Sequence, residues 1–280
     1  MPRGHPQRPP AHAGAPDTYP AAVTDDAVFR KGSATAPPGY FRWEAAGLAW
    51  LADAPGGARV AEVLEVGEDH LDLRRLSFVN PDPGMAEAFG AGLARVHDAG
   101  ASAFGVAPPG WSGDGYLGPV SELLPLPLQP TSSWGEFYAN QRLLPTLALG
   151  VDRGVFHRHD VHLVEAVARR VSRGEFDDGS SPARIHGDLW SGNVLWTADG
   201  AVLIDPAAHG GHRETDLAML SLFGCPHWDF VIGGYLEQHR LDAEWPARVA
   251  LHQLHPLLVH AVLFGGDYPA RAMAAAKRYR

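Results

Sequence analysis

Cysteine, lysine and long apolar segments are scarce in this chain of 280 residues. The single cysteine, Cys225, excludes an intramolecular disulfide and any zinc or iron–sulfur centre built from several cysteines. No apolar run reaches the roughly 18 to 20 residues that a membrane-spanning helix needs, and the N-terminal stretch has no apolar core typical of a signal peptide. We therefore expect a cytoplasmic protein that does not bind to membranes.

Positive charge is also scarce, because the chain has 23 Lys and Arg but 32 Asp and Glu, which gives a net charge of −9. A protein that neutralises a phosphate backbone needs the opposite sign, so nucleic acid is excluded as the expected partner. The composition is 45% hydrophobic and 20% charged, which is typical of a folded chain with a large core. The length suits one large domain or two lobes.

Proline is concentrated in residues 1–20, which we expect to form an irregular arm or a shortened start of the first lobe. Residues 21–80 are predicted to form a small, mainly β lobe. The hydrophobic pattern in this lobe predicts one helix, at residues 41–52, and four strands, at residues 21–24, 27–31, 60–66 and 70–76. The first two strands would form a hairpin.

The pattern becomes helical after the Asn80–Gly84 break, so residues 81–280 are predicted to form a larger lobe. Residues 103–130 are rich in glycine and proline and are predicted to be a long ordered loop. The predicted helices lie at residues 85–99, 133–149, 160–173, 228–239 and 246–264. The fold class that follows is α+β, with a small β-rich lobe and a larger, mainly helical one.

The helical pattern is interrupted by a predicted hairpin in which residues 194–196 pair with 202–204 across Asp199-Gly200. Asp188 and Asn193 precede the first strand and Asp205 follows the second, so three oxygen-bearing side chains converge at the open end. Oxygen ligands suit a hard cation such as Mg²⁺, which substrate phosphates usually complete.

The spacing of these residues indicates phosphoryl transfer. His186-x-Asp188-x-x-x-x-Asn193 has the spacing of the protein-kinase catalytic loop, in which the Asp receives the proton of the substrate hydroxyl and the Asn holds a metal ion. Asp205 would be the second metal ligand. Pro206 and Ala207 follow it where protein kinases have Phe-Gly.

Such a site also needs a lysine on the small lobe to hold ATP phosphates and a helix carboxylate to orient that lysine. Lys31 ends a predicted strand, and Glu44 lies in the first turns of the predicted helix. Only Lys31 and Lys277 are lysines, so a lysine at this position is unusual for the chain. We predict that Lys31 binds phosphate and that Glu44 orients it.

Several longer stretches resemble the fructosamine kinase (ketosamine 3-kinase) family. They are VFRK, EAAGLAWL, LARVH, WGEFYANQRLLP, IHGDLWSGNVLW, IDPAAHGGHRETDLAMLSLFG and LHQLHPLLVHAVLFG, which together span roughly residues 14–268. The resemblance implies a two-lobed, protein-kinase-like fold shared with aminoglycoside phosphotransferases. It also implies ATP and Mg²⁺ as cofactors and phosphorylation of the sugar 3-hydroxyl of small ketosamines, a step linked to deglycation of amines or proteins.

Carried over to this sequence, the resemblance makes Asp188 the catalytic base, and Asn193 and Asp205 the metal ligands. It pairs Lys31 with Glu44 at the phosphates. It also makes residues 21–80 the nucleotide-binding lobe and residues 81–280 the lobe for catalysis and substrate binding.

The resemblance also gives roles to residues around this centre. Trp190 would stack on the sugar, and backbone groups near Arg75 and Leu76 would bind adenine. His212 and Glu214 are further candidates for substrate contact. Glu214, together with Arg213 and Asp216, better suits a brace of the catalytic loop or the start of the following helix.

Two departures and two alternatives stay open. The family usually carries a glycine-containing phosphate loop where this chain has its proline-rich arm, and Arg74 stands where the family tends to have Glu. An aminoglycoside or other amino-sugar phosphotransferase would use the same catalytic loop. A weakly active nucleotide-binding regulatory module is the alternative from another class. The oligomeric state is not predicted.

Overall fold

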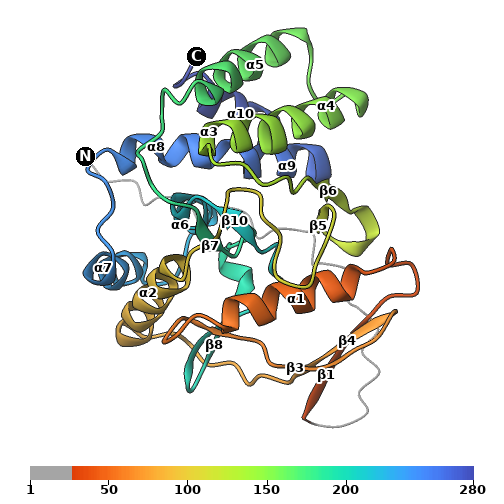
Figure 1. The fold of residues 1–280 in the computed structure, drawn as a ribbon, viewed down its shortest axis with the longest axis vertical. Coiled ribbons are helices and arrows are strands. Elements are labelled where there is room, and N and C mark those ends of the chain that lie inside the picture. The colour runs from red at the N-terminus through yellow and green to blue at the C-terminus, as the bar shows by residue number, and fades with distance from the viewer. Residues whose placement is uncertain (1–26) are drawn as a thin grey trace, which may run out of the picture.

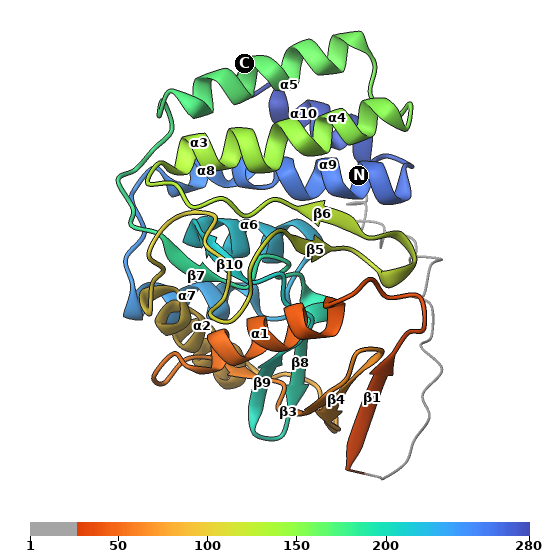
Figure 2. The same ribbon diagram turned by 45° about the vertical axis from the view of Figure 1, so that its right-hand side comes forward.

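The computed structural model describes residues 27–280 and places a small sheet at one end and a group of helices at the other (Figure 1). The turned view shows helix α1 (Tyr40–Ala52) between the small sheet and two central strands, β7 (Ala183–Ile185) and β10 (His209–Gly211) (Figure 2). The predicted strand at 21–24 and the proline-rich arm lie outside the described residues. The α+β class and the two-part arrangement are confirmed.

The small sheet has the strand order β1-β4-β3 and is antiparallel throughout, formed by β1 (Val28–Gly32), β3 (Val63–Val66) and β4 (His70–Arg74). Helix α1 (Tyr40–Ala52) covers it because Phe41 and Leu48 repeat on one helix face and pack with Leu71 of β4. In the β1–β4 register, Lys31 stands opposite Leu71. The strand therefore points the lysine side chain toward the helix that carries Glu44.

The predicted hairpin is confirmed as β8 (Val194–Thr197) and β9 (Gly200–Leu203), with Leu195 opposite Val202. A short strand, β2 (Arg59–Val60), pairs with β9 in parallel and extends this sheet to the order β2-β9-β8. Since β2 belongs to the predicted small lobe and β9 to the large one, the hydrogen-bonded sheet crosses the boundary predicted near residue 80.

Helices α2 (Pro83–Asp98) and α7 (Trp228–Gln238) lie side by side. A Cβ atom built on Gly90 would stand 1.9 Å from the carbonyl oxygen of Val231, and one on Gly234 would stand 2.1 Å from that of Glu87. The two glycines thus let the helix backbones approach more closely than any side chain allows.

The large lobe ends in a helical group. Its helices are α3 (Trp134–Tyr138), α4 (Leu144–Asp152), α5 (Arg158–Ser172), α6 (Arg213–Phe223), α8 (Trp245–His252), α9 (Leu254–Phe264) and α10 (Tyr268–Ala276). Helix α10 was not among the helices that the sequence predicted. The central strands β7 (Ala183–Ile185) and β10 (His209–Gly211) pair antiparallel below this group.

Two predicted helices are divided by prolines. The prediction at 133–149 becomes α3, a π-helical turn (Ala139–Leu143) and α4, and Pro145 lacks the N–H that would bond to the carbonyl of Gln141. Arg142 Nη1 donates to that carbonyl instead, at 2.8 Å. The prediction at 246–264 becomes α8 and α9, because Pro256 cannot donate to the carbonyl of His252.

The predicted long loop at 103–130 contains a small hairpin of β5 (Gly115–Leu117) and β6 (Leu124–Leu126). Within residues 27–280, no helix has both the length and the apolar character that crossing a membrane requires.

Candidate active site

Lys31 lies in the interior with only 4% of its surface exposed, between two carboxylates. Its Nζ atom donates to Glu44 Oε2 at 2.7 Å and to Asp205 Oδ1 at 2.8 Å. Burial opposes the charged form, yet the negative charges of Glu44 and Asp205 raise the pKa of Lys31 well above its ordinary value. The three residues predicted from distant parts of the sequence thus meet around one ammonium group.

Asp205 follows β9 with a backbone φ of 53°, in the left-handed region that a residue with a side chain rarely adopts. Nearly half of its side chain is exposed, whereas the partner carboxylate of Glu44 is buried. The unusual backbone turns the carboxylate out of the sheet and toward Lys31. Backbone strain of this kind is typical of functional sites.

Asp188 and Asn193 face each other across the catalytic loop. The Nδ2 atom of Asn193 donates to the backbone carbonyl of Asp188 at 2.8 Å and to its Oδ2 atom at 3.2 Å. Desolvation, followed by the nearby charge of Asp205, raises the pKa of the Asp188 carboxyl to about 7. A carboxyl group whose pKa lies near neutral pH can accept a proton from a substrate hydroxyl, so this pKa suits a general base.

Asp216 of α6 holds the backbone of the catalytic loop through two hydrogen bonds. Its Oδ2 atom accepts from the N–H of His186 at 2.7 Å, and Oδ1 accepts from the N–H of Gly187 at 3.0 Å. His97 contacts Asp216 Oδ2 at 3.2 Å and Tyr235 Oη at 2.8 Å, all within the interior. The sequence suggested a bracing role for Asp216, but it did not single out His97 or Tyr235.

The donor set fits Mg²⁺. The Asn193 amide nitrogen is used on Asp188, so its oxygen is left for a cation, and Asp205 uses one carboxylate oxygen on Lys31. An amide oxygen and a carboxylate are the hard ligands that Mg²⁺ takes, with waters and phosphates completing its shell.

Arg75 and Leu76 directly follow β4 at the connection between the lobes. The N–H of Arg75 already donates to the carbonyl of Ala27 at 2.9 Å, and the Arg75 guanidinium donates to the carbonyl of Val28. The prediction that adenine binds to backbone groups here must therefore exclude the Arg75 N–H. Leu76 packs its side chain against the small-lobe core.

Trp190 is 41% exposed beside the catalytic loop. Its ring lies over the backbone of Gly192, where a Cβ atom would approach the ring to 2.2 Å. The ring also contacts Phe223 of α6, with centroids 6.4 Å apart and planes at 74°. Phe223 was not predicted as a site residue. Its only sequence signal was its place in the stretch that resembles the family.

The surroundings of His212 and Glu214 argue against their predicted contact with a substrate. Both are almost fully buried, at 2% and 1% exposure. Arg248 of α8 donates from Nε and Nη2 to the Glu214 carboxylate, while His212 Nε2 lies 3.2 Å from Asp178. Their polar atoms are thus occupied by protein groups, and their role is structural.

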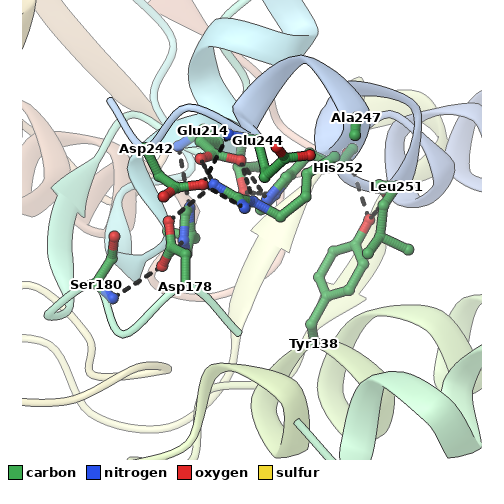
Figure 3. Close-up of polar contacts among 12 residues, drawn as sticks. Tyr138, Asp178, Ser180, Glu214, Asp242, Glu244, Ala247, Leu251 and His252 are labelled. Carbon is green, nitrogen blue, oxygen red and sulfur yellow. Dashed lines mark hydrogen bonds and ion pairs between the residues drawn. The ribbon is translucent and has the colours of Figure 1, made fainter. Parts of the chain in front are cut away.

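Glu214 and Asp178 belong to an ionic cluster that Asp242 completes (Figure 3). The side chains of Asp178 and Glu214 are buried, whereas that of Asp242 is 46% exposed. His212, Glu214 and His252 lie close enough to hold a metal ion. However, the Arg248 guanidinium bonds to Asp178, Asp242 and both oxygens of Glu214. Arg248 therefore already supplies a positive charge to the Glu214 carboxylate, one of the three candidate ligands.

Comparison with known proteins agrees with this geometry. A model of the family described as fructosamine kinase matches residues 11–279. A probable ketoamine kinase of Thermus thermophilus is 34% identical over 237 residues, covering 83% of this chain and 79% of the relative. A probable ketoamine kinase of Synechocystis is also 34% identical, over 76% of this chain and 68% of the relative.

Solved structures show the same relationship. A candidate fructosamine-3-kinase of Thermobifida fusca superposes with a TM-score of 0.82 at 48% identity, covering 90% of this chain and 85% of that one. A choline kinase of Streptococcus pneumoniae shares the fold alone, with a TM-score of 0.58 at 15% identity over 92% of this chain and 88% of that one. The protein is thus a phosphotransferase of kinase-like fold, and the chain belongs to the fructosamine kinase family.

Proposed function

We propose that this protein is an ATP- and Mg²⁺-dependent kinase that phosphorylates the sugar 3-hydroxyl of ketosamines. The observation that supports it most strongly is the meeting of Lys31, Glu44 and Asp205 a short way from Asp188 and Asn193. The family match supports ketosamines as the substrate class. The product would enter the deglycation of amines or proteins in the cytoplasm.

Asp188 is the group that handles the proton. Its carboxylate would accept a hydrogen bond from the sugar hydroxyl and orient that oxygen toward the γ-phosphate. It would take the proton as the bond from the sugar oxygen to the γ-phosphorus forms and the bond from that phosphorus to the leaving ADP breaks. Asn193 holds the Asp188 carboxylate in place through its amide nitrogen. Because most of the barrier to phosphoryl transfer is removed by positioning and by charge neutralisation, this fixed geometry matters more than base strength.

Lys31 supplies positive charge at the phosphates. Glu44 holds its ammonium group in a fixed position, so little reorganisation is needed when the nucleotide binds. Asn193 and Asp205 would hold Mg²⁺, which would neutralise charge on the β- and γ-phosphates. The contact between Lys31 and Asp205 would then give way in part to phosphate oxygens.

The test is ADP release from Mg-ATP with a ribulosamine, a fructosamine or an aminoglycoside as acceptor. Asp188→Asn is the blank, and Asp53→Asn, which changes an exposed carboxylate, is the matched control. We expect turnover on a ketosamine in the control and at least about a 1000-fold loss of kcat in Asp188→Asn. Phosphorus NMR of the product would place the phosphate on the 3-oxygen.

The alternatives give different results in the same assay. Turnover on an aminoglycoside with none on either ketosamine would replace the substrate assignment. A folded protein that binds Mg-ATP without turning over any acceptor would favour the regulatory module.

A further inference from the structure

A row of aromatic side chains leads away from Trp190. Phe223, which contacts the Trp190 ring, lies 4.7 Å from the His260 ring of α9, with planes at 33°. The row continues to Tyr268 at the start of α10, whose ring centroid is 5.0 Å from His260 and 6.5 Å from Phe223. Helix α6 and the consecutive helices α9 and α10 thus contribute to one surface beside the catalytic loop.

A cation stands at the outer end of this row. The guanidinium carbon of Arg271 lies 5.3 Å from the centroid of the Tyr268 ring. In the part of the chain that the structure describes, Arg271 makes no ion pair with a carboxylate. The Tyr268 ring stabilises the guanidinium without neutralising its charge, which is available to an anion.

The position of the row relates it to one end of the substrate. Its residues all come from the large lobe, whereas Lys31 and Glu44 hold the phosphate side from the small lobe. In a ketosamine the nitrogen is on C1 and the accepting oxygen on C3. With that oxygen at Asp188 and the sugar stacked on Trp190, as the family resemblance implies, the amine and its substituent would lie next to Phe223. Aromatic rings attract the ammonium that such an amine forms.

We propose that Phe223 and Tyr268 bind the amine-side group of the ketosamine and that Arg271 selects adducts whose amine carries a carboxylate. This inference rests on the proposed function. The substrate class it names is the sugar adducts of amino acids and short peptides. Arg271 recognises the anionic end, as guanidinium groups commonly do with carboxylates.

Two acceptors that differ only in charge test the inference: the fructose adducts of 6-aminohexanoate and of hexylamine. The unmodified protein is expected to show a KM at least about tenfold lower for the carboxylate adduct, a difference of about 1.4 kcal/mol. Arg271→Gln should bring the two KM values together. Arg278→Gln, at an exposed arginine just beyond α10, should keep the preference.

A second pair of variants tests the rings. Phe223→Leu and Tyr268→Leu should raise KM for both adducts while KM for ATP stays the same, which a general loss of folding would not produce. Equal KM values for the two adducts in the unmodified protein would overturn the inference and leave the kinase intact. Absence of turnover on both adducts and on every other ketosamine would overturn the proposed function and this inference together.

Discussion

Lys31 and Glu44 form a buried ion pair 2.7 Å long that joins the edge strand of the small sheet to the helix covering it. Both side chains are about 5% exposed, so neither charge can be satisfied by water if its partner is removed. This pair is at once part of the small-lobe core and part of the proposed phosphate site.

Replacing Glu44 with Gln should therefore affect both stability and activity. Removing one member of a buried pair costs about 3 kcal/mol, the low end of the usual range because Asp205 still contacts Lys31. We expect kcat/KM for ATP to fall about 100-fold. Denaturant titration and steady-state kinetics would measure the two effects.

Glu62→Gln is the matched control, since its pair with Arg74 is solvent-exposed. It should change neither quantity appreciably. Activity that survived in Glu44→Gln at the control's level would show that Lys31 needs no orienting carboxylate.

The hydrogen bonds from the catalytic loop to Asp216 predict a loss of turnover in Asp216→Asn. Each of the two backbone N–H groups now donates to a different carboxylate oxygen of Asp216, and an amide side chain would offer only one oxygen. One donor would therefore be left unsatisfied in the interior, at a cost of about 1–3 kcal/mol. We expect kcat to fall about 100-fold while KM for ATP changes less than about threefold. A variant in which KM for ATP rose as much as kcat fell would contradict this role.

The glycines between α2 and α7 predict opposite effects for neighbouring substitutions. Gly234→Ala would drive a methyl group into the carbonyl of Glu87 and should destabilise the fold by at least about 2 kcal/mol. Gly233→Ala, one residue earlier in the same helix, meets nothing within 4 Å and should stabilise it by about 0.5–1 kcal/mol. Thermal unfolding of the two variants checks the sign, and equal shifts would exclude the close helix contact.

Acidification should reduce stability in two stages. Burial lowers the pKa of His97 and His186, and that of His252 to about 4, so the unfolded chain takes up protons first, below about pH 6.5. Burial opposes ionisation of Glu214 and Asp216, but hydrogen bonds and neighbouring cations or histidines hold their pKa values below the ordinary range. Their stabilisation is complete above about pH 4.5 and is lost as pH falls further.

Denaturation midpoints measured from pH 8 to pH 3 would show both stages. His252→Gln should reduce the slope between pH 6.5 and pH 4.5, because one buried imidazole no longer resists protonation. A midpoint that stayed constant from pH 7 to pH 5 would contradict the first stage.

Much of the site could be predicted from sequence because its residues lie close to regular elements. Asp188, Asn193 and Asp205 flank one hairpin, whose alternating pattern and Asp-Gly turn fix the register. Lys31 was distinguished by the scarcity of lysine. The roles of these residues remain predictions, whereas their proximity is observed.

Other features depend on contacts that no local pattern reports. His212 and Glu214 lie in a motif that resembles the family, yet only the position of Arg248 on α8 shows that their polar atoms are already engaged. The breaks at Pro145 and Pro256 were missed because the apolar periodicity continues through both prolines. Helix α10 was missed because most of its positions are alanine, whose small side chain marks a buried face less clearly than a large apolar one.

The two ends of α1 are held by different sheets. Because Arg59 and Val60 are hydrogen-bonded to β9, the chain directly after α1 is fixed to the same hairpin that ends at Asp205. The side chains near the start of α1 pack instead on the β1-β4-β3 sheet. If nucleotide binding moves the small sheet relative to the large lobe, α1 should pivot about its C-terminal end. Glu44, near the N-terminal end of α1, would then move with the small sheet and keep its contact with Lys31.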